Sequence, residues 1–387
     1  MHAFTLGLAV SISLSELALA ALAVALLLEP RSLRRLHWPL LGPMLAFAAW
    51  TLVAALASVW PVTSLLTARN LLVLGAFYVV LNTLPDAAAA RRFAIVLFVL
   101  IAIVSALAIA QVMACPAAPP PWPVLGRFLR KCDRAHAFYS IYMTLAGVLS
   151  LVLLAALPRV VNAGRQAVWM MPAWVVGVVG LGLTYVRGAW LAFGAAVLAS
   201  LFLVSRRIVA RLALAAVVLA ALFAVPGVLD RVRTLGTLND NTTLDRLAMI
   251  EGGLALVGEH PLLGVGPGGV SALYPEYAPD IAMRRHTSHL HNTPLQLAAE
   301  RGLPGLAAWL AIYVAFFTQA VAILRALPAA RGEDHALVLG CLIAVAAFLA
   351  AGLFEYNFGD TEVLLVACAL MALPFVVEKD LAATPRP

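Results

Sequence analysis

The sequence predicts an all-α, polytopic integral membrane protein of about 11 or 12 transmembrane helices. Of its 387 residues, 63% are hydrophobic and only 12% are charged, and the mean hydropathy is +0.97. A soluble domain carries roughly 25% charged residues, so these values exclude a soluble enzyme. Long apolar runs also recur along most of the chain, which predicts a bundle of membrane helices.

Apolar runs of about 20 residues, the length that crosses a bilayer as a helix, predict eleven spans. They lie near residues 4–28, 38–57, 65–84, 92–114, 136–157, 168–186, 188–205, 207–225, 298–325, 335–354 and 361–378. The first run is interrupted by Ser11, Ser13, Ser15 and Glu16. A break there would replace one span by two short helices and raise the count to twelve.

The loops predict the orientation, because lysine and arginine are retained on the cytoplasmic side of a membrane. Alternate loops and the tail hold 14 basic residues, namely Arg31, Arg34, Arg35, Arg91, Arg92, Arg159, Arg165, Arg206, Arg207, Arg211, Arg325, Arg331, Lys379 and Arg386. These loops are assigned to the cytoplasm. The other loops, among them 115–135, 185–190 and 226–297, then face the opposite side.

Four regions follow from this pattern. Residues 1–225 form N-terminal transmembrane helices, 226–297 a cap segment, 298–378 C-terminal transmembrane helices and 379–387 a cytoplasmic tail. About 70 residues bury little core alone, so the cap is predicted to lie across the outer helix ends. Within it, a helix is predicted to begin near Leu244, capped by Asn241, Thr242 or Thr243.

The 115–135 loop departs from the charge rule, since it lies on the non-cytoplasmic side and yet is basic. It contains Arg127, Arg130, Lys131 and Arg134 against only Asp133. Either the topology differs there or the charge serves a ligand. The same loop holds Cys115 and Cys132, and two cysteines in a non-cytoplasmic loop are predicted to form a disulfide.

Two arginines on the predicted non-cytoplasmic side are candidate anion-binding residues. Arg187 lies in a very short link between two spans, where it either snorkels to the interface or binds phosphate oxygens bidentately. Arg246 lies in the predicted first turn of the cap helix. It is either a solvated residue paired with Asp245 or Glu251, or part of an anion site at the helix N-terminus.

Three histidines occur within six residues, at His286, His289 and His291. Such a cluster raises the possibility of a metal site, but the spacing fits no standard zinc pattern. One alternative is a single catalytic histidine at the start of a span, because a neutral imidazole accepts a proton near physiological pH. Another is a group of solvated loop histidines.

The order of these elements resembles a known family. Arg187-Gly-Ala-Trp-Leu191 resembles the Arg-x-x-x-Leu element of the O-antigen ligases. His291-Asn292, followed after nine residues by Gly302-x-x-Gly305, resembles their second element. The segment from Arg246 through 260–269 is similar to the ligase and polymerase domain, and the similarity covers roughly residues 180–360.

The resemblance implies a GT-C-like glycosyltransferase of the bacterial inner membrane, with its active site on the periplasmic side. Such enzymes transfer a glycan from undecaprenyl diphosphate to a hydroxyl of an acceptor, here the lipid A-core oligosaccharide, without cofactor or metal. His291 is then the general base. Arg187 and Arg246 are expected to stabilise negative charge on the leaving diphosphate. Direct in-line displacement would invert the anomeric centre.

Further residues are candidates for a supporting role: Arg69, His289, Asn292, Glu355, Asp360, Arg127 and Arg130. Among these, Glu355 and Asp360 belong to an acidic turn that could orient His291 or bind sugar hydroxyls. The phosphates of an acceptor glycolipid could be bound by Arg127, Arg130 and Lys131.

Other functions with the same lipid-linked donor stay open, namely an O-linked protein oligosaccharyltransferase or an O-antigen polymerase. The chain ends at Pro387, shortly after the last apolar run, which favours the ligase over the oligosaccharyltransferase. A non-enzymatic lipid-linked glycan transporter would be expected to carry internal repeats and midplane charges, and these are scarce. Binding to nucleic acid is not expected, because no soluble segment interleaves basic and aromatic residues.

Overall fold

A computed structural model describes residues 1–29, 36–116, 121–122, 126, 128–162, 168–204 and 241–383. This part of the chain is helical. Its helices are α1 (His2–Val10), α2 (Ile12–Leu28), α4 (Leu41–Leu56), α5 (Pro61–Ala68), η1 (Arg69–Leu74), α6 (Gly75–Thr83), α7 (Ala87–Met113), α9 (Tyr142–Val161), α10 (Met170–Leu183), α11 (Arg187–Val204), α14 (Asn241–Glu259), α15 (Gly269–Tyr277), α16 (Thr293–Ala326), α17 (Gly332–Ala351), η3 (Asn357–Gly359) and α18 (Thr361–Ala383). The predicted all-α fold of a polytopic membrane protein is confirmed.

Six runs of the described helices are long and apolar enough to cross a membrane: Pro61–Thr83, Ala87–Met113, Tyr142–Val161, Thr293–Ala326, Gly332–Ala351 and Thr361–Ala383. The shorter apolar helices α2, α4 and α10 occupy three further predicted spans. The predicted span 207–225 lies outside the described residues. The count of 11 or 12 therefore stays a prediction.

The first predicted span is two helices, as the interrupting serines allowed. Ser11 has an extended backbone between α1 and α2, and its hydroxyl accepts a hydrogen bond from the Leu14 amide at 3.4 Å. A Cβ atom on Gly7 would lie 2.4 Å from the Ser15 nitrogen. The absence of a side chain at Gly7 therefore lets α1 and α2 approach each other closely beside the break at Ser11.

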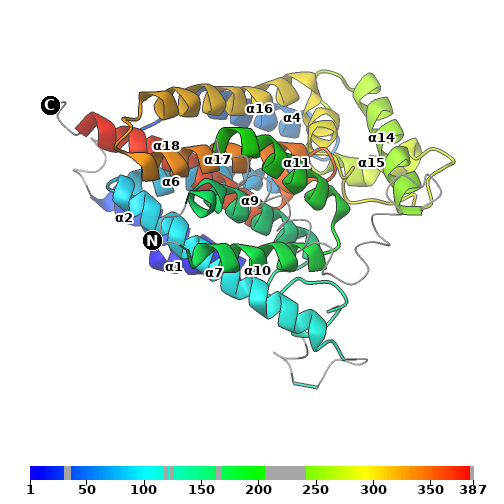
Figure 1. Cartoon of the computed structure of the whole chain (residues 1–387). Helices are drawn as coiled ribbons and strands as arrows, with labels where there is room; N and C mark the ends of the chain where they lie inside the picture. The colour runs from blue at the N-terminus through cyan, green and yellow to red at the C-terminus, as the bar shows by residue number, and fades with distance from the viewer. Residues whose placement is uncertain are drawn as a thin grey trace.

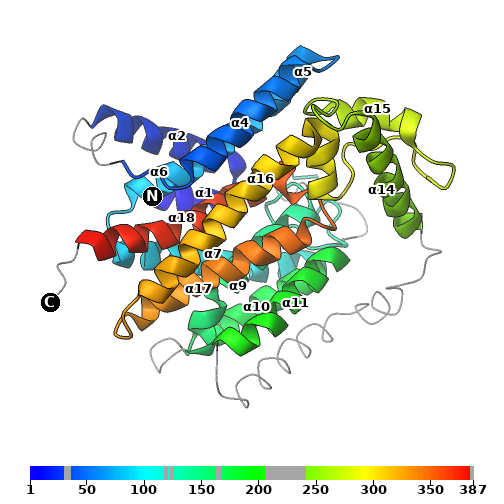
Figure 2. The same ribbon diagram turned by 90° about the horizontal axis from the view of Figure 1, so that it is seen from above.

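Helix α18 forms the centre of the bundle, and Figures 1 and 2 show it among α6, α9, α16 and α17. Its residues 363–377 are buried without interruption, as expected for a helix that is apolar on every side. Small residues bring its neighbours together, since a Cβ on Gly340 of α17 would lie 2.0 Å from the Ala155 carbonyl oxygen of α9. Close backbone approach at glycine is typical of membrane helix packing.

Several predicted boundaries shift. Helix α16 begins at Thr293 because the Asn292 side chain caps it. Helix α18 continues to Ala383, so residues 379–383 of the predicted tail are helical. The Lys379 ammonium supports this extension by donating to the carbonyl oxygens of Leu81 and Leu84, at 3.2 and 2.7 Å.

The cap helices α14 and α15 lie at one end of the bundle, and the C-terminus lies at the other (Figures 1 and 2). They share a small core with the start of α16, formed by Met249, Leu256, Val265, Val270, Tyr274, Ala278, Leu290 and Ala299. Described residues of the cap segment thus pack on the membrane helices. Residues 226–240 of the predicted cap lie outside the described part.

Candidate functional site

The start of α16 and the turn between α17 and α18 are hydrogen-bonded together at the cap end of the bundle. The Thr293 amide donates to the Gly352 carbonyl oxygen at 2.6 Å, and the Thr293 hydroxyl donates to the Glu355 carbonyl oxygen at 2.9 Å. Asn292 adds two bonds, since its side chain accepts from the Leu295 amide at 2.9 Å and donates to the Leu353 carbonyl oxygen at 3.0 Å. Asn292 therefore positions the residue before it.

His291 occupies a left-handed backbone conformation, with φ of 48°. Residues other than glycine rarely adopt this conformation, and such outliers gather at functional sites. Its Nδ1 atom lies 2.6 Å from Oε1 of Glu355, and both side chains are about four-fifths buried. A carboxylate partner favours the tautomer with a proton on Nδ1 and leaves the Nε2 lone pair as a proton acceptor.

Glu355 is held in its ionised form by this site. Burial raises the pKa of Glu355, but the hydrogen bond with His291 and the charges of His291, Arg246 and His289 outweigh burial and lower it. The charged carboxylate is the form that orients an imidazole and stabilises its protonated state. His291 and Glu355 thus have the arrangement of a general base and the residue that positions it.

Arg246 joins the same group from the cap. Its guanidinium lies 3.6 Å from Oε2 of Glu355, and it also donates to the Phe354 carbonyl oxygen at 2.5 Å. It does not pair with Asp245, which accepts instead from the amides of Met283 and Arg284 at 2.8 and 3.0 Å. Because the described part of α14 already begins at Asn241, Arg246 lies beyond the first turn, where the field of a helix N-terminus is weaker.

Arg187 is the first residue of α11 and is half-buried. The preceding link has one left-handed residue, Tyr185, with φ of 54°. A Cβ on Gly188 would lie 2.7 Å from Cβ of Phe354, so the start of α11 packs directly on the residue whose carbonyl group binds Arg246. The structure therefore brings the Arg187 link and Arg246 to the same turn.

A cavity of about 280 Å³ lies among these segments, and we call it the site cavity. Its lining includes Arg246, His289, Glu355 and Asp360, together with Gly188 beside Arg187. The volume suits a small group, such as one sugar ring or a diphosphate, more than a whole glycolipid. The arrangement combines a space for a reacting group with the cation of Arg246 at its wall and with His291, which contacts the lining residue Glu355.

His289 faces this cavity and packs against His291, with ring centroids 4.3 Å apart and ring planes at 82°. Burial, aided by the nearby His291, lowers the pKa of His289. His289, His291 and Glu355 lie close enough together to hold a metal ion. However, the guanidinium of Arg246 lies beside the same carboxylate, and its charge would oppose a divalent cation.

Asp360 has a mainly structural position. Its carboxylate accepts from the Thr144 hydroxyl at 2.6 Å and from the amides of Glu362 and Val363 at 3.1 and 3.3 Å. Burial raises the pKa of Asp360 despite these hydrogen bonds. Asp360 therefore caps α18 and connects it to α9 through the hydrogen bond from Thr144. The sequence analysis did not predict this structural role of Asp360.

Other candidates lie apart from this group. Arg69 begins η1 and is exposed, as is Arg130, and neither is among the described residues that line the site cavity. Arg127 lies outside the described residues. Cys115 and Cys132 are joined by a disulfide that closes the predicted basic loop.

A buried ionic group behind the site was also missed. In α16, Glu300 and Arg301 are almost fully buried and paired at 2.6 Å. Glu300 also accepts from Gln296 and from the Gly268 amide, both at 2.8 Å. The sequence could have indicated this group, because charged residues such as Glu300 and Arg301 within a predicted apolar span usually have a functional or structural role. These contacts hold residues 264–269, which we call the glycine-rich turn, against α16.

The pair of His291 and Glu355 leads to a first prediction. If His291 is the general base that the sequence predicts, Glu355→Gln should lower the rate of its reaction by about 10- to 1,000-fold, because the amide can favour the wrong imidazole tautomer and carries no charge. Reaction kinetics over a range of pH would measure this, with Glu355→Asp expected to recover part of the rate. The exposed Glu251→Gln is a control for loss of an acid at the same end. Equal rates for both glutamine variants would contradict the positioning role.

Comparison with known families bears on the same residues. Residues 172–310 match the sequence family described as O-antigen ligase. The matched region contains Arg187, Arg246 and His291, whereas Glu355 lies beyond it. None of the curated proteins matches the chain. This polytopic membrane protein therefore carries, at residues 172–310, a domain of the O-antigen ligase superfamily.

Proposed function

We propose that the protein is an O-antigen ligase of the bacterial inner membrane, a GT-C-like glycosyltransferase. It transfers a glycan from undecaprenyl diphosphate to a hydroxyl of the lipid A-core oligosaccharide at the periplasmic face. The contacts of Glu355 with both His291 and Arg246, beside a cavity at the cap end that Glu355 and Arg246 line, carry this proposal. The basic residues in the opposite set of loops support the assignment of the cap end to the periplasm.

His291 acts as the general base in this reaction. Its Nε2 atom removes the proton of the acceptor hydroxyl while the hydroxyl oxygen attacks the anomeric carbon. The bond from that carbon to the diphosphate oxygen breaks, and the electron pair leaves with the diphosphate. Glu355 stabilises the imidazolium that forms.

Arg187 and Arg246 stabilise the negative charge that grows on the leaving diphosphate. A guanidinium offers several donors and binds phosphate oxygens bidentately. Arg246 lines the site cavity and is one-third exposed, so it has donors free of its contact with Glu355. Fixed cations in a half-buried site lower the barrier without reorganising in the transition state.

A direct displacement inverts the anomeric centre. The two carboxylates of the cavity have other partners, since Glu355 contacts His291 and Arg246, and Asp360 caps α18. Neither is offered to the substrate as a nucleophile. This supports a single step without a glycosyl-enzyme intermediate, and it assigns no role to a metal.

Reconstitution tests the proposal with purified protein, undecaprenyl diphosphate glycan and a lipid A-core acceptor, with product followed by gel shift. Arg187→Ala and Arg246→Ala should each lower the rate by about 10²- to 10³-fold, because each removes a cation from the leaving group. Arg284→Ala removes an arginine that is 80% exposed at the same end and should keep the wild-type rate.

Other outcomes of this assay would redirect the assignment. Transfer to a pilin in place of the glycolipid would indicate a protein oligosaccharyltransferase, and elongation of the donor glycan would indicate a polymerase. Movement of the donor across a vesicle without transfer would indicate a transporter. Inhibition by a chelator that Zn²⁺ reverses would favour the metal site over the general base.

A further inference from the structure

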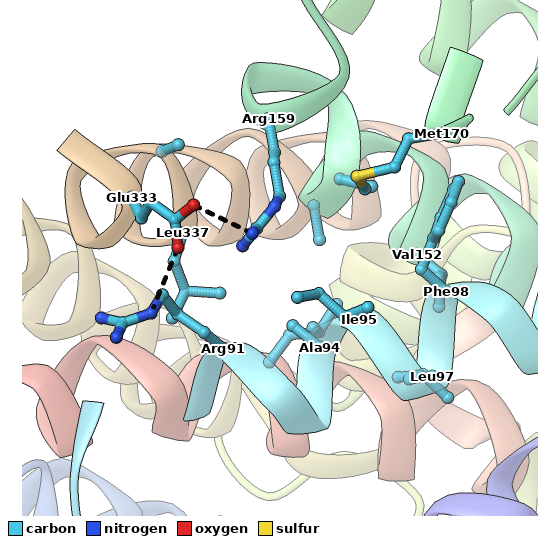
Figure 3. Close-up of a pocket in the computed structure, with 14 residues that line it drawn as sticks. Arg91, Ala94, Ile95, Leu97, Phe98, Val152, Arg159, Met170, Glu333 and Leu337 are labelled. Atoms are coloured by element: carbon cyan, nitrogen blue, oxygen red, sulfur yellow. Dashed lines mark hydrogen bonds and ion pairs between the residues drawn. The ribbon is translucent and has the colours of Figure 1, made fainter. Parts of the chain in front are cut away.

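A second cavity lies at the end of the bundle opposite the site cavity, and Figure 3 shows its residues. Arg91 lies near the start of α7, Arg159 near the end of α9 and Glu333 near the start of α17. Helices α9 and α17 have their other ends at the site cavity, through Ile141 and Ala351. This second cavity, which we call the arginine cavity, is thus at the predicted cytoplasmic end.

The arginine cavity has one polar edge and an apolar wall. Its polar edge is Arg91, Arg159 and Glu333, and its wall consists largely of aliphatic and aromatic side chains from α7, α9 and the start of α10 (Figure 3). The enclosed volume is about 30 Å³. That is room for one or two water-sized groups and far too little for a hydrocarbon chain.

Glu333 bridges the two guanidiniums. Its Oε1 atom lies 3.1 Å from Nη2 of Arg159, and its Oε2 atom lies 3.5 Å from Nε of Arg91. The Glu333 side chain is 63% exposed, whereas each arginine is only 25% exposed. Two half-buried cations therefore share one exposed carboxylate, an ion pair of the kind that contributes little to stability and can be exchanged for another anion.

The Arg91 guanidinium is held in place without Glu333. It also pairs with Asp334, whose side chain is 2% exposed. Asp334 in turn accepts from Nε of Arg331 at 2.5 Å, and Arg331 reaches Asp380 on α18 at 2.5 Å. Asp334 thus holds the Arg91 guanidinium in place. If Glu333 moved away, Arg91 would remain as a preorganised cation at the edge of the cavity.

We propose that Arg91 and Arg159 bind the phosphate of an anionic glycerophospholipid, and that Glu333 occupies this position when no lipid is bound. Two guanidiniums offer a phosphate more charge-assisted hydrogen bonds than one carboxylate can accept. Only phosphate oxygens fit the enclosed volume, so the lipid tails stay in the bilayer. Basic pockets between helices on the cytoplasmic side are a recurrent form of lipid headgroup site.

Lipid titration of the full-length protein in detergent, followed by native mass spectrometry, tests this assignment. The probes are phosphatidylglycerol, phosphatidylcholine and inorganic phosphate. The protein should bind phosphatidylglycerol in preference to both others. Arg159→Gln should weaken this binding about tenfold, the loss expected when a charge-assisted hydrogen bond is removed. The neighbouring exposed Arg92→Gln is the matched control and should bind as the wild type does.

Glu333→Gln distinguishes a lipid site from a structural ion pair. If Glu333 competes with the phosphate, its loss should strengthen phosphatidylglycerol binding about threefold, the scale of an exposed ion pair. A structural ion pair would give no gain in lipid binding. Unchanged binding in Glu333→Gln, equal binding of Arg159→Gln and Arg92→Gln, or equal affinity for inorganic phosphate would each overturn the proposal. Because Arg91 balances buried Asp334, Arg159 and Glu333 are the better positions to vary.

Discussion

Replacing His291 with alanine is expected to lower the rate of glycan transfer by about 10²- to 10⁴-fold, the contribution typical of a general base. The methyl group cannot accept the proton of the acceptor hydroxyl, and Glu355 loses the group that it positions. The measurement is the initial rate of product formation at saturating donor and acceptor. A loss of turnover without a matching loss of donor binding is the expected pattern, because the base acts in the transition state.

A matched variant separates this effect from general damage to the loop. His286 is exposed and lies in the same segment, so His286→Ala should keep the wild-type rate. Both variants should express and unfold like the parent, because the cap of α16 is made by Asn292 rather than by either histidine. Wild-type turnover in His291→Ala would remove His291 from the role of general base.

Gly302→Ala is expected to destabilise the protein by roughly 2–5 kcal/mol, the combined cost of an unfavourable backbone conformation and an overpacked contact. Gly302 has φ of 68° and ψ of 177° within α16, a region of conformational space that only glycine adopts readily. A Cβ atom there would lie 1.9 Å from the Leu262 carbonyl oxygen. That atom belongs to backbone, so no side-chain rotation can relieve the contact.

The measurement is the thermal midpoint of the purified protein, read from its tryptophan fluorescence. Gly258→Ala is the control, because Gly258 lies in α14 and a Cβ atom there would have no neighbour within 4 Å. Gly258 is exposed and is the next-to-last residue of α14, so alanine there meets no contact and the control should be about as stable as the wild type. Equal midpoints for the two variants would show that α16 is not broken at Gly302.

The second family element thus has two physical roles. His291 contacts Glu355. Gly302 has a non-helical backbone conformation, and this breaks α16 where the glycine-rich turn is bound. The Leu303 amide donates to the Pro261 carbonyl oxygen at 2.8 Å, and the Val265 amide donates to the Ala299 carbonyl oxygen at 2.9 Å. These bonds place the glycine-rich turn against α16, and through it α14 with Arg246.

The sequence alone predicted the helices well, because hydropathy and helix length are properties of a single segment. Every described membrane helix overlaps a predicted span, and the interrupted first run contains the break at Ser11. Boundaries were less accurate where a side chain decides them. Asn292 starts α16 before the apolar run begins, and Lys379 extends α18 beyond its end.

The motifs also pointed to Arg187, Arg246 and His291 as a group, and the acidic turn with Glu355 and Asp360 was a candidate to orient His291. The sequence did not choose between these two carboxylates, and it did not predict that Glu355 also contacts Arg246. Asp245 and Glu251 were the acids near Arg246 in the sequence, yet Arg246 contacts Glu355, which is more than 100 residues away. Likewise His291 pairs with an acid 64 residues further along the chain. Several carboxylates were available, and hydropathy does not distinguish among them.

The sequence by itself determined the membrane class, the positions of the helices and the residue types available for chemistry, because each depends on local composition and spacing. Apart from the disulfide of Cys115 with Cys132, only the tertiary structure decided which of these side chains contact one another. The turn after α17 is bound to the start of α16, and this contact makes Glu355 the partner of both His291 and Arg246. The physical reason is that such pairs form between helix ends, whose mutual placement is set by the packing of the whole bundle.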